Sequence, residues 1–249
     1  MWAIGIIPAR YASERFPGKP LAKLLGRPMV CWVAERASQA ELLDKVIVAT
    51  DDERIAEAVD ACGFEAVMTS DRHSSGSDRV WEVARCTDAE VVVNIQGDEP
   101  TVTAAAVDTC LRPLRERDDV DVVTLRSPIL DAEDLLRPDV VKVAADAEGF
   151  AFYFSRSPIP YPGDGEPDPR LHFRHVGIYA YRREALQRFC QQPPSELELK
   201  ERLEQLRGLE AGLRYLVVET GYRSVDVNTP ADLARAEELL RGSGGGGKE

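Results

Sequence analysis

Three basic residues, Arg10, Arg15 and Lys19, lie within ten positions of one another, shortly after the apolar run of residues 4–7. Arginine and lysine donate charged hydrogen bonds to phosphate oxygens, and a loop that leaves a parallel strand can add backbone amides. Across residues 1–30, five cations and one acid give a charge of +4, whereas the whole chain carries −12. This contrast predicts a local anion site suited to a triphosphate.

The basic loop is not a Walker A motif. Gly18 and Lys19 are followed by Pro20 instead of serine or threonine, and no glycine stands at Ser13. A solvent-exposed basic turn is the alternative interpretation, because charged runs are often only solvated surface.

Acidic residues that could hold a metal follow two later segments. Asp98 lies in the sequence QGDEP, directly after the apolar run of residues 91–95, where a carboxylate suits Mg²⁺ bound to nucleotide phosphates. The alternative is that Asp98 caps the turn before the next helix. Near the end of the chain, alternation along an extended segment puts Asp226 and Asn228 on one face. We favour Asp226 as the second metal ligand and Asn228 as its co-ligand, because a carboxylate neutralises Mg²⁺ better than an amide.

Short aliphatic runs alternate with amphipathic stretches through the first half of the chain, which predicts parallel strands connected by helices that cover both faces of a sheet. Strands are expected at residues 4–7, 46–49, 66–68 and 91–95, and helices at 28–39, 53–62, 77–86 and 104–115. Ligands of such sheets bind beyond the carboxyl ends of the strands. Functional residues are therefore expected directly after each run.

From residue 120 the pattern changes to closely spaced apolar runs that are typical of an antiparallel or mixed sheet. We expect a hairpin turn at 146–149, a proline-rich loop at 157–170 and a long polar helix at 197–211. The remaining elements expected are strands at 120–125, 140–144, 150–154, 175–181 and 215–218, and a helix at 231–241. Residues 242–249 form a glycine-rich tail that we expect to be disordered, although its first six residues match G-x-G-x-x-G without the strand and helix which that motif requires.

Composition excludes several classes of protein. The chain is 44% hydrophobic, no window approaches 18 uncharged apolar residues, and the first residues do not resemble a signal peptide, so we expect a cytoplasmic protein without a membrane span. A net charge of −12 gives no global attraction to nucleic acid or to an anionic membrane. Five scattered cysteines indicate reduced thiols, and His172 and His175 lack neighbours at zinc-site spacing.

Several motifs together resemble the 3-deoxy-manno-octulosonate cytidylyltransferase family, the CMP-Kdo synthetases of lipopolysaccharide biosynthesis. The resemblance covers about residues 4–239. The motifs that carry it are IIPARYASERFPGKPLAKLLGRPMV, VATDDERI, SGSDR, VNIQGDEP, YFSRSPIP, RHVGIYAY and LEQLR. The chain departs from the family where a usual Val-Asp-Thr-Pro or Ile-Asp-Thr-Pro reads Val-Asn228-Thr-Pro, which leaves the second metal ligand open between Asp226 and Asn228.

The resemblance implies roles for individual residues. CTP is expected to contact Ala9, Arg10, Ser13, Arg15, Lys19, Ser75, Gly76, Asp78 and Gln96, with the three cations on the phosphates that leave as pyrophosphate. The sugar acid is expected to contact Arg79, Gln96, Arg156, His175, Tyr179, Glu204 and Gln205. For Ser75 and Gly76 an ordinary helix cap is the alternative, and for Glu204 and Gln205 a solvated helix face.

The resemblance further implies an α/β fold of the nucleotidyltransferase type, with a Rossmann-like, mostly parallel mixed sheet. Residues 1–241 would form a single domain, in which 120–212 is an insertion for sugar binding and homodimerisation. The implied reaction is Mg²⁺-dependent transfer of CMP from CTP to the anomeric hydroxyl of Kdo. The alternatives are another α-keto acid sugar such as 8-amino-Kdo, a glycosyltransferase of similar layout, and a noncatalytic nucleotide-binding module.

Overall fold

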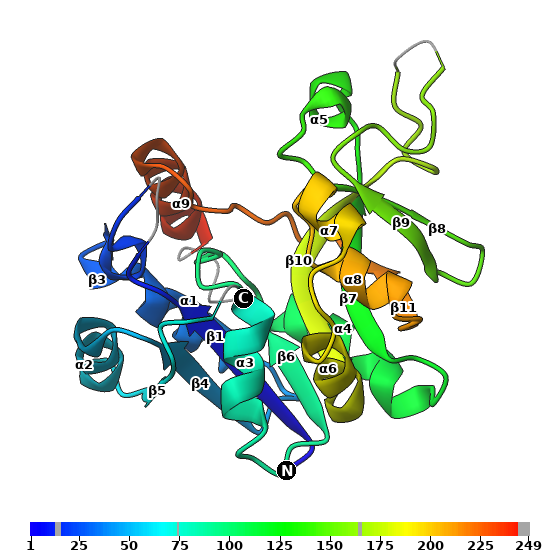
Figure 1. The fold of residues 1–249 in the computed structure, drawn as a ribbon. Helices are drawn as coiled ribbons and strands as arrows, with labels where there is room; N and C mark the ends of the chain where they lie inside the picture. Colours follow the sequence, from blue (N-terminus) through cyan, green and yellow to red (C-terminus); the bar gives the residue numbers. More distant parts are fainter. Residues whose placement is uncertain (13–15, 74, 164–165, 244–249) are drawn as a thin grey trace. The chain divides into compact units, whose positions relative to one another are not determined.

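Parallel strands form where the buried aliphatic runs lie in the first part of the chain (Figure 1). The computed structural model describes residues 1–12, 16–73, 75–163 and 166–243. They fall into two compact units, of which the first comprises Met1–Asp108 with Ser224–Glu249 and the second Thr109–Arg223. The first unit therefore contains segments from both ends of the chain.

The first unit is built around β1 (Ala3–Ala9), whose residues are buried except for Pro8, which is half-buried. On one side β1 pairs in parallel with β6 (Val91–Asn94), and on the other with β4 (Lys45–Thr50). Outside β4 lies β5 (Glu65–Met68), also parallel. Branched aliphatic residues favour this arrangement because both faces of a parallel sheet are covered.

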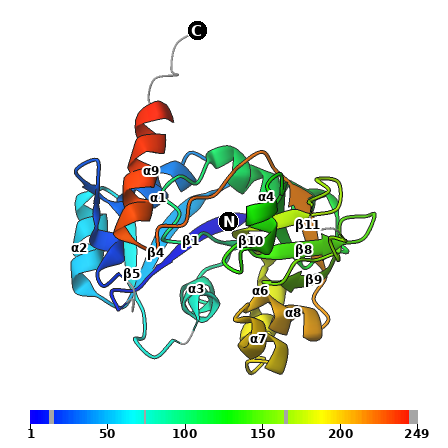
Figure 2. The same cartoon turned by 90° about the horizontal axis from the view of Figure 1, so that it is seen from above.

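Helices cover both faces of these strands, as expected. Figure 2 shows α1 (Met29–Ala37) and α3 (Gly76–Ala84) on opposite sides of β1. Two helices begin at side-chain caps: Asp52 accepts from the amide of Arg54 at the start of α2 (Glu53–Ala61), and Ser75 caps α3. Each cap sets the residue at which its helix begins. A loop therefore remains between the helix and the strand before it.

The end of the chain completes the first unit. Helix α9 (Pro230–Ser243) contributes Ala236 and Leu240 to a buried cluster, together with Val227 from the segment before it. Leu24, in the small hairpin before α1, and Met29, the first residue of α1, are the other buried members of that cluster. The elements of this hairpin region are η1 (Lys19–Leu21), β2 (Lys23–Leu24) and β3 (Arg27–Pro28).

The second unit has the mixed sheet expected from residue 120 onward. Its longest strand, β10 (Phe173–Arg182), is antiparallel to β7 (Val122–Pro128) and to β8 (Lys142–Ala145). Strand β11 (Tyr215–Glu219) adds to β7 in parallel, and β9 (Ala151–Ser155) adds to β8 through the expected turn at 146–149. The helices here are α5 (Ala132–Leu136), α6 (Arg183–Cys190), α7 (Glu196–Glu201) and α8 (Gln205–Glu210). Helix α4 (Ala104–Glu116) spans the division between the units.

The expected fold class is confirmed, with parallel strands in the first unit and mainly antiparallel strands in the second. The prediction of one helix over residues 197–211 is wrong. Arg202 adopts a left-handed conformation with φ of 55°, which ends α7 before α8 begins. The last helix also runs on to Ser243, two residues into the segment predicted to be disordered, and residues 244–249 lie outside the described part.

In the described part of the chain, no helix is both long and apolar enough to cross a membrane.

Candidate active site

A cavity of about 400 Å³ lies at the carboxyl ends of the parallel strands in the first unit. Its walls come from the end of β1, the η1 segment, the start of α3, the loop after β6 and the segment before α9. The described lining residues are Pro8, Ala9, Arg10, Lys19, Pro20, His73, Ser75, Gly76, Arg79, Gln96, Gly97, Asp98 and Asn228. The expectation that functional residues follow the strands therefore agrees with the position of this cavity.

Close packing of two backbones forms the floor of the cavity. A Cβ atom added at Gly97 would lie 2.7 Å from the carbonyl oxygen of Pro8, closer than real Cβ atoms approach such an oxygen. Only glycine allows the loop after β6 to lie this close to the end of β1. As a result, Gln96 and Asp98 line the same cavity as Ala9 and Arg10.

A cation from the basic loop meets the first predicted metal ligand. The Nζ atom of Lys19 lies 2.8 Å from Oδ2 of Asp98, and their side chains are 15% and 30% exposed. The left-handed Gly18, with φ of 69°, precedes Lys19 and starts η1. Arg10 lines the same cavity and is exposed, whereas Ser13 and Arg15 lie outside the described residues.

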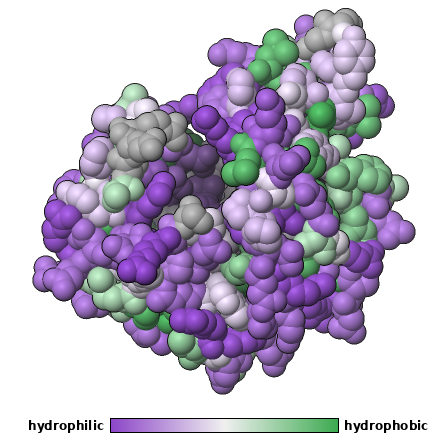
Figure 3. All heavy atoms as spheres, viewed as in Figure 1, coloured by the Kyte–Doolittle hydropathy of each residue, from purple (hydrophilic) through white to green (hydrophobic). Residues whose placement is uncertain are grey.

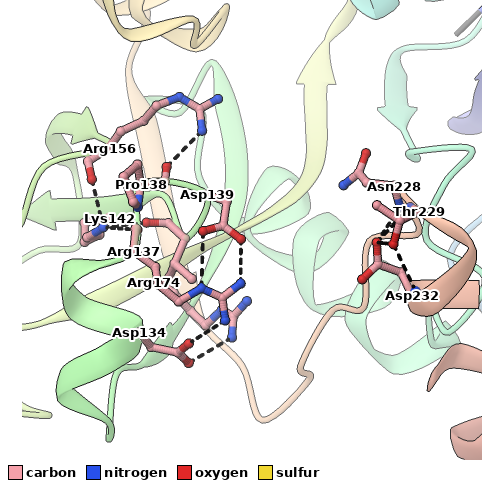
Figure 4. Close-up of polar contacts among 11 residues, drawn as sticks. Asp134, Arg137, Pro138, Asp139, Lys142, Arg156, Arg174, Asn228, Thr229 and Asp232 are labelled. Carbon is pink, nitrogen blue, oxygen red and sulfur yellow. Dashed lines mark hydrogen bonds and ion pairs between the residues drawn. The ribbon is translucent and has the colours of Figure 1, made fainter. Parts of the chain in front are cut away.

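The segment before α9 reaches the cavity through one backbone hydrogen bond. The amide of Val227 donates to the carbonyl oxygen of Asp98 at 2.9 Å. Figure 4 shows the next turn, where the carboxylate of Asp232 accepts from the amides of Asn228 and Thr229 at 3.1 and 2.8 Å. Asn228 lines the cavity, while Asp226 is exposed and is not among the described lining residues.

The start of α3, which carries the SGSDR motif, forms one wall of the cavity. Ser75 Oγ accepts from the amide of Asp78 at 3.2 Å and donates to its Oδ2 at 2.8 Å. The serine is therefore a helix cap, and it lines the cavity as well. A helix start carries partial positive charge, which favours an anion beside it.

Arg79, one turn into α3, is buried in the same wall. Its Nη2 lies 2.7 Å from Oδ2 of Asp51 and its Nη1 lies 2.5 Å from Oγ1 of Thr69. Asp51 lies in the VATDDERI motif, but neither Asp51 nor Thr69 was among the predicted site residues. His73 was also missed; it lines the cavity, and its Nε2 contacts the carboxylate of Glu82. The sequence feature that could have indicated His73 is its position two residues before the SGSDR motif.

The donor set of the cavity fits magnesium that arrives together with phosphates. Mg²⁺ usually binds one or two carboxylates and keeps its other positions for water and substrate oxygens. Among the described lining residues Asp98 supplies the carboxylate, and Asn228 and Gln96 supply amide oxygens. Within the described residues no group of three or more His, Cys, Asp or Glu could hold a metal ion alone.

Two residues assigned to the sugar lie together in the second unit. The rings of His175 and Tyr179 are 5.2 Å apart between centroids, and Nε2 of His175 lies 2.8 Å from Oγ1 of Thr124. Burial lowers the pKa of His175 to about 3. The imidazole is therefore neutral near pH 7, so it can accept or donate a hydrogen bond without carrying charge.

Three further residues assigned to the sugar, Glu204, Gln205 and Arg156, also belong to the second unit. Gln205 is buried at the start of α8, and Glu204 precedes it as the N-terminal boundary residue. Arg156 donates to the carbonyl oxygens of Glu201, Pro138 and Arg202 at 2.7, 2.9 and 3.2 Å; Figure 4 shows the bond to Pro138. The guanidinium of Arg156 therefore binds backbone carbonyl oxygens in this structure.

The parallel sheet and the polar cavity at its carboxyl edge are those of a nucleotide-binding α/β protein. Residues 4–218 match the cytidylyltransferase family, and the chain belongs to that family.

Two relatives and one solved structure show which kind of cytidylyltransferase this chain resembles. A 3-deoxy-manno-octulosonate cytidylyltransferase of Geobacter sulfurreducens is 49% identical over 95% of this chain and 98% of its own length. One from Solibacter usitatus is 48% identical over 96% of this chain and 95% of its own length. The solved structure of a CMP:2-keto-3-deoxy-manno-octonic acid synthetase complexed with CTP is 43% identical, with a TM-score of 0.91 over 98% of this chain and 100% of that chain.

Proposed function

We propose that this chain transfers CMP from CTP to the anomeric hydroxyl of 3-deoxy-manno-octulosonate, giving CMP-Kdo and pyrophosphate. The observation that supports it most is that Arg10 and Lys19 line the same cavity as Asp98 and Asn228. Cations from the start of the chain and oxygen ligands from later segments thus meet at one place. A nucleoside triphosphate with a bound cation needs this combination.

The chain's own residues bind and orient the nucleotide. Arg10 and Lys19 neutralise the β- and γ-phosphates, which carry the charge that leaves as pyrophosphate. Ser75, Gly76 and Asp78, at the start of α3, contact the cytosine and ribose. Because phosphoryl transfer needs little covalent help, this positioning and neutralisation carry most of the catalysis.

Magnesium is part of the proposal. When bound, it would screen the repulsion between two anionic substrates and lower the pKa of the attacking hydroxyl. Asp98 and Asn228 line the cavity and would hold it, with Asp226 as the alternative second ligand. In this structure the carboxylate of Asp98 accepts from the ammonium of Lys19 at 2.8 Å, so the cation would join a carboxylate that is already held in place.

The proposed contacts to the sugar include cations, neutral polar groups and one carboxylate. Arg79 supplies a cation for the carboxylate of the sugar, and Gln96 lies between the two substrates. His175, Tyr179, Glu204, Gln205 and Arg156 are the proposed contacts to its hydroxyl groups. Neutral His175 suits this role because a hydroxyl both donates and accepts hydrogen bonds.

An assay of the four nucleoside triphosphates against Kdo tests the proposal, with pyrophosphate release as the readout. We expect release with CTP that depends on both Kdo and Mg²⁺. Release without sugar, or with every triphosphate equally, would contradict it. Competition between Kdo and 8-amino-Kdo, compared by kcat/KM, decides the sugar, and consumption of CMP-Kdo without pyrophosphate would instead indicate a glycosyltransferase.

We propose that the active form is a homodimer in the cytoplasm, where CTP is available. Most of the exposed large apolar side chains among the described residues lie on the second unit, and Figure 3 shows such patches over α5 and the β8–β9 hairpin. Leu130, Leu136, Phe152 and Leu171 are 63%, 60%, 68% and 57% exposed. Apolar surface of this kind is typical of an interface. Light scattering after size exclusion should give twice 27.5 kDa, and one chain mass would contradict the dimer.

A further inference from the structure

Arg79 differs from the other cations of the cavity in how firmly it is held. The residue is 3% exposed, while Arg10 is exposed and the side chain of Lys19 is 15% exposed. A cation on an exposed side chain must be ordered when an anion binds, which costs conformational entropy. A buried cation that its neighbours already hold in place is ordered before the anion binds, so binding costs less conformational entropy.

Two groups from different loops fix the guanidinium. Asp51 follows β4 directly, and its side chain, 14% exposed, pairs with Nη2 of Arg79. Thr69 follows β5 and accepts from Nη1. The Thr69 hydroxyl in turn donates to the carbonyl oxygen of Thr50 at 3.0 Å, so the acceptor is itself anchored to the end of β4. The guanidinium is therefore held at two of its nitrogens by the carboxyl ends of two adjacent strands.

We propose that Asp51, assisted by Thr69, is the positioning residue that fixes Arg79 to receive the carboxylate of the acidic sugar. This assignment rests on the proposed function. A guanidinium recognises a carboxylate best when its planar fork is oriented, and fixing it beforehand removes the entropy cost of binding.

Because Asp51 is an acid, positioning and simple charge attraction predict opposite changes in the KM for the sugar. Replacing Asp51 with asparagine makes the wall of the cavity one unit more positive, so if charge alone mattered, the KM for an anionic sugar would fall. Positioning predicts the opposite, because Arg79 loses one of its two fixed partners. The direction of the change in KM therefore separates the two explanations.

Steady-state kinetics of Asp51→Asn with Kdo varied at saturating CTP tests the proposal. We expect the KM for Kdo to rise up to about tenfold, the scale of one lost hydrogen bond, while the KM for CTP changes less than about twofold. Arg79→Lys should raise the KM for Kdo similarly, since lysine cannot bind both partners in one plane. In the double variant the two effects should not multiply, because both act through the same guanidinium.

Asp108→Asn is the matched control for loss of a buried carboxylate. Asp108 is 7% exposed and accepts from the amides of Glu41 and Leu42 at 3.2 and 2.9 Å, and it does not line the cavity. We expect its KM for Kdo to stay at the wild-type value even if its Tm falls. Should Asp51→Asn fold poorly, Asp51→Glu keeps the charge but displaces it, and a KM for Kdo raised above wild type supports the proposal.

An unchanged or lower KM for Kdo in a folded Asp51 variant, or effects that multiply with those of Arg79→Lys, would overturn the assignment. A wild-type chain that makes no nucleotide sugar from Kdo would contradict the proposed function and this assignment together. A wild type that is active, beside an Asp51 variant with normal KM, contradicts only the role of Asp51.

Discussion

The backbone amide of Val227 donates a hydrogen bond of 2.9 Å to the carbonyl oxygen of Asp98. This bond joins the loop after β6 to a segment near the end of the chain. Val227 is fully buried, so its position is fixed by the core as well as by the bond. Its neighbour Asn228 is thereby brought to the cavity that Asp98 lines.

Replacing Asp98 with asparagine should lower turnover by at least about a hundredfold, because the proposed cation loses its carboxylate. The partly exposed pair with Lys19 contributes little to stability, so the Tm should change little. Pyrophosphate release and a thermal melt measure the two effects. Near-normal product formation by this variant would refute the metal role of Asp98.

Replacing Gly97 with alanine should lower both stability and activity. The new methyl group would lie 2.7 Å from the carbonyl oxygen of Pro8, which is backbone and cannot move alone. We expect a loss of roughly 1–3 kcal/mol in the free energy of unfolding, measured by denaturant titration.

Gly221→Ala is the control for that variant, since a Cβ atom at Gly221 meets nothing within 4 Å. Its stability and activity should match the wild type. Equal stability of the two alanine variants would show that the close approach of Gly97 to Pro8 is not required.

His175 should make the protein less stable in acid. Its pKa is about 3 in the folded chain, below the usual 6.5 of an imidazole, so the unfolded chain binds the proton more readily. The contribution of His175 to the free energy of unfolding is fully present above pH 6.5. This contribution falls by up to about 1.4 kcal/mol per pH unit as the pH drops toward 3. Denaturant titrations of the wild type and His175→Gln from pH 7.5 to 4 should therefore give curves that approach each other in acid. Parallel curves would contradict the lowered pKa.

Lys142 should be important for the fold of the second unit. The residue is fully buried, and its Nζ donates to the carbonyl oxygens of Arg137, Val140 and Arg156 at 2.7, 2.7 and 2.8 Å (Figure 4). Lys142→Met would leave these three acceptors without their charged donor, and we expect a loss of about 3 kcal/mol in the free energy of unfolding. Lys200→Met, on the exposed face of α7, should cost almost nothing. A fully stable Lys142→Met would show that water can replace the ammonium.

The fold could be predicted where buried aliphatic runs follow one another. The four parallel strands of the first unit and the turn at 146–149 lie where hydrophobic pattern and turn residues placed them, because both signals are local. The break between α7 and α8 was not predictable, since Arg202 is an ordinary helix former that adopts a left-handed conformation only in this context.

The candidate site could be predicted in part for the same reason. Asp98 lies in the loop after β6 and Lys19 in the basic loop after β1, and their charges suggest a metal and phosphate. Asp51 also follows a strand, but nothing in its own sequence indicates that its partner is Arg79. The choice between Asp226 and Asn228 likewise depends on which side chain the buried Val227 leaves facing the cavity, a property of packing that alternation alone does not give.

The segment that carries Asn228 and α9 is the last part of the first unit to be synthesised. A nascent chain that has released the four parallel strands from the ribosome still lacks one wall of the cavity and part of the cluster around Leu24 and Met29. Until that segment is made, the cavity lacks the wall that carries Asn228. A chain cut short after the second unit would leave that apolar cluster open to solvent.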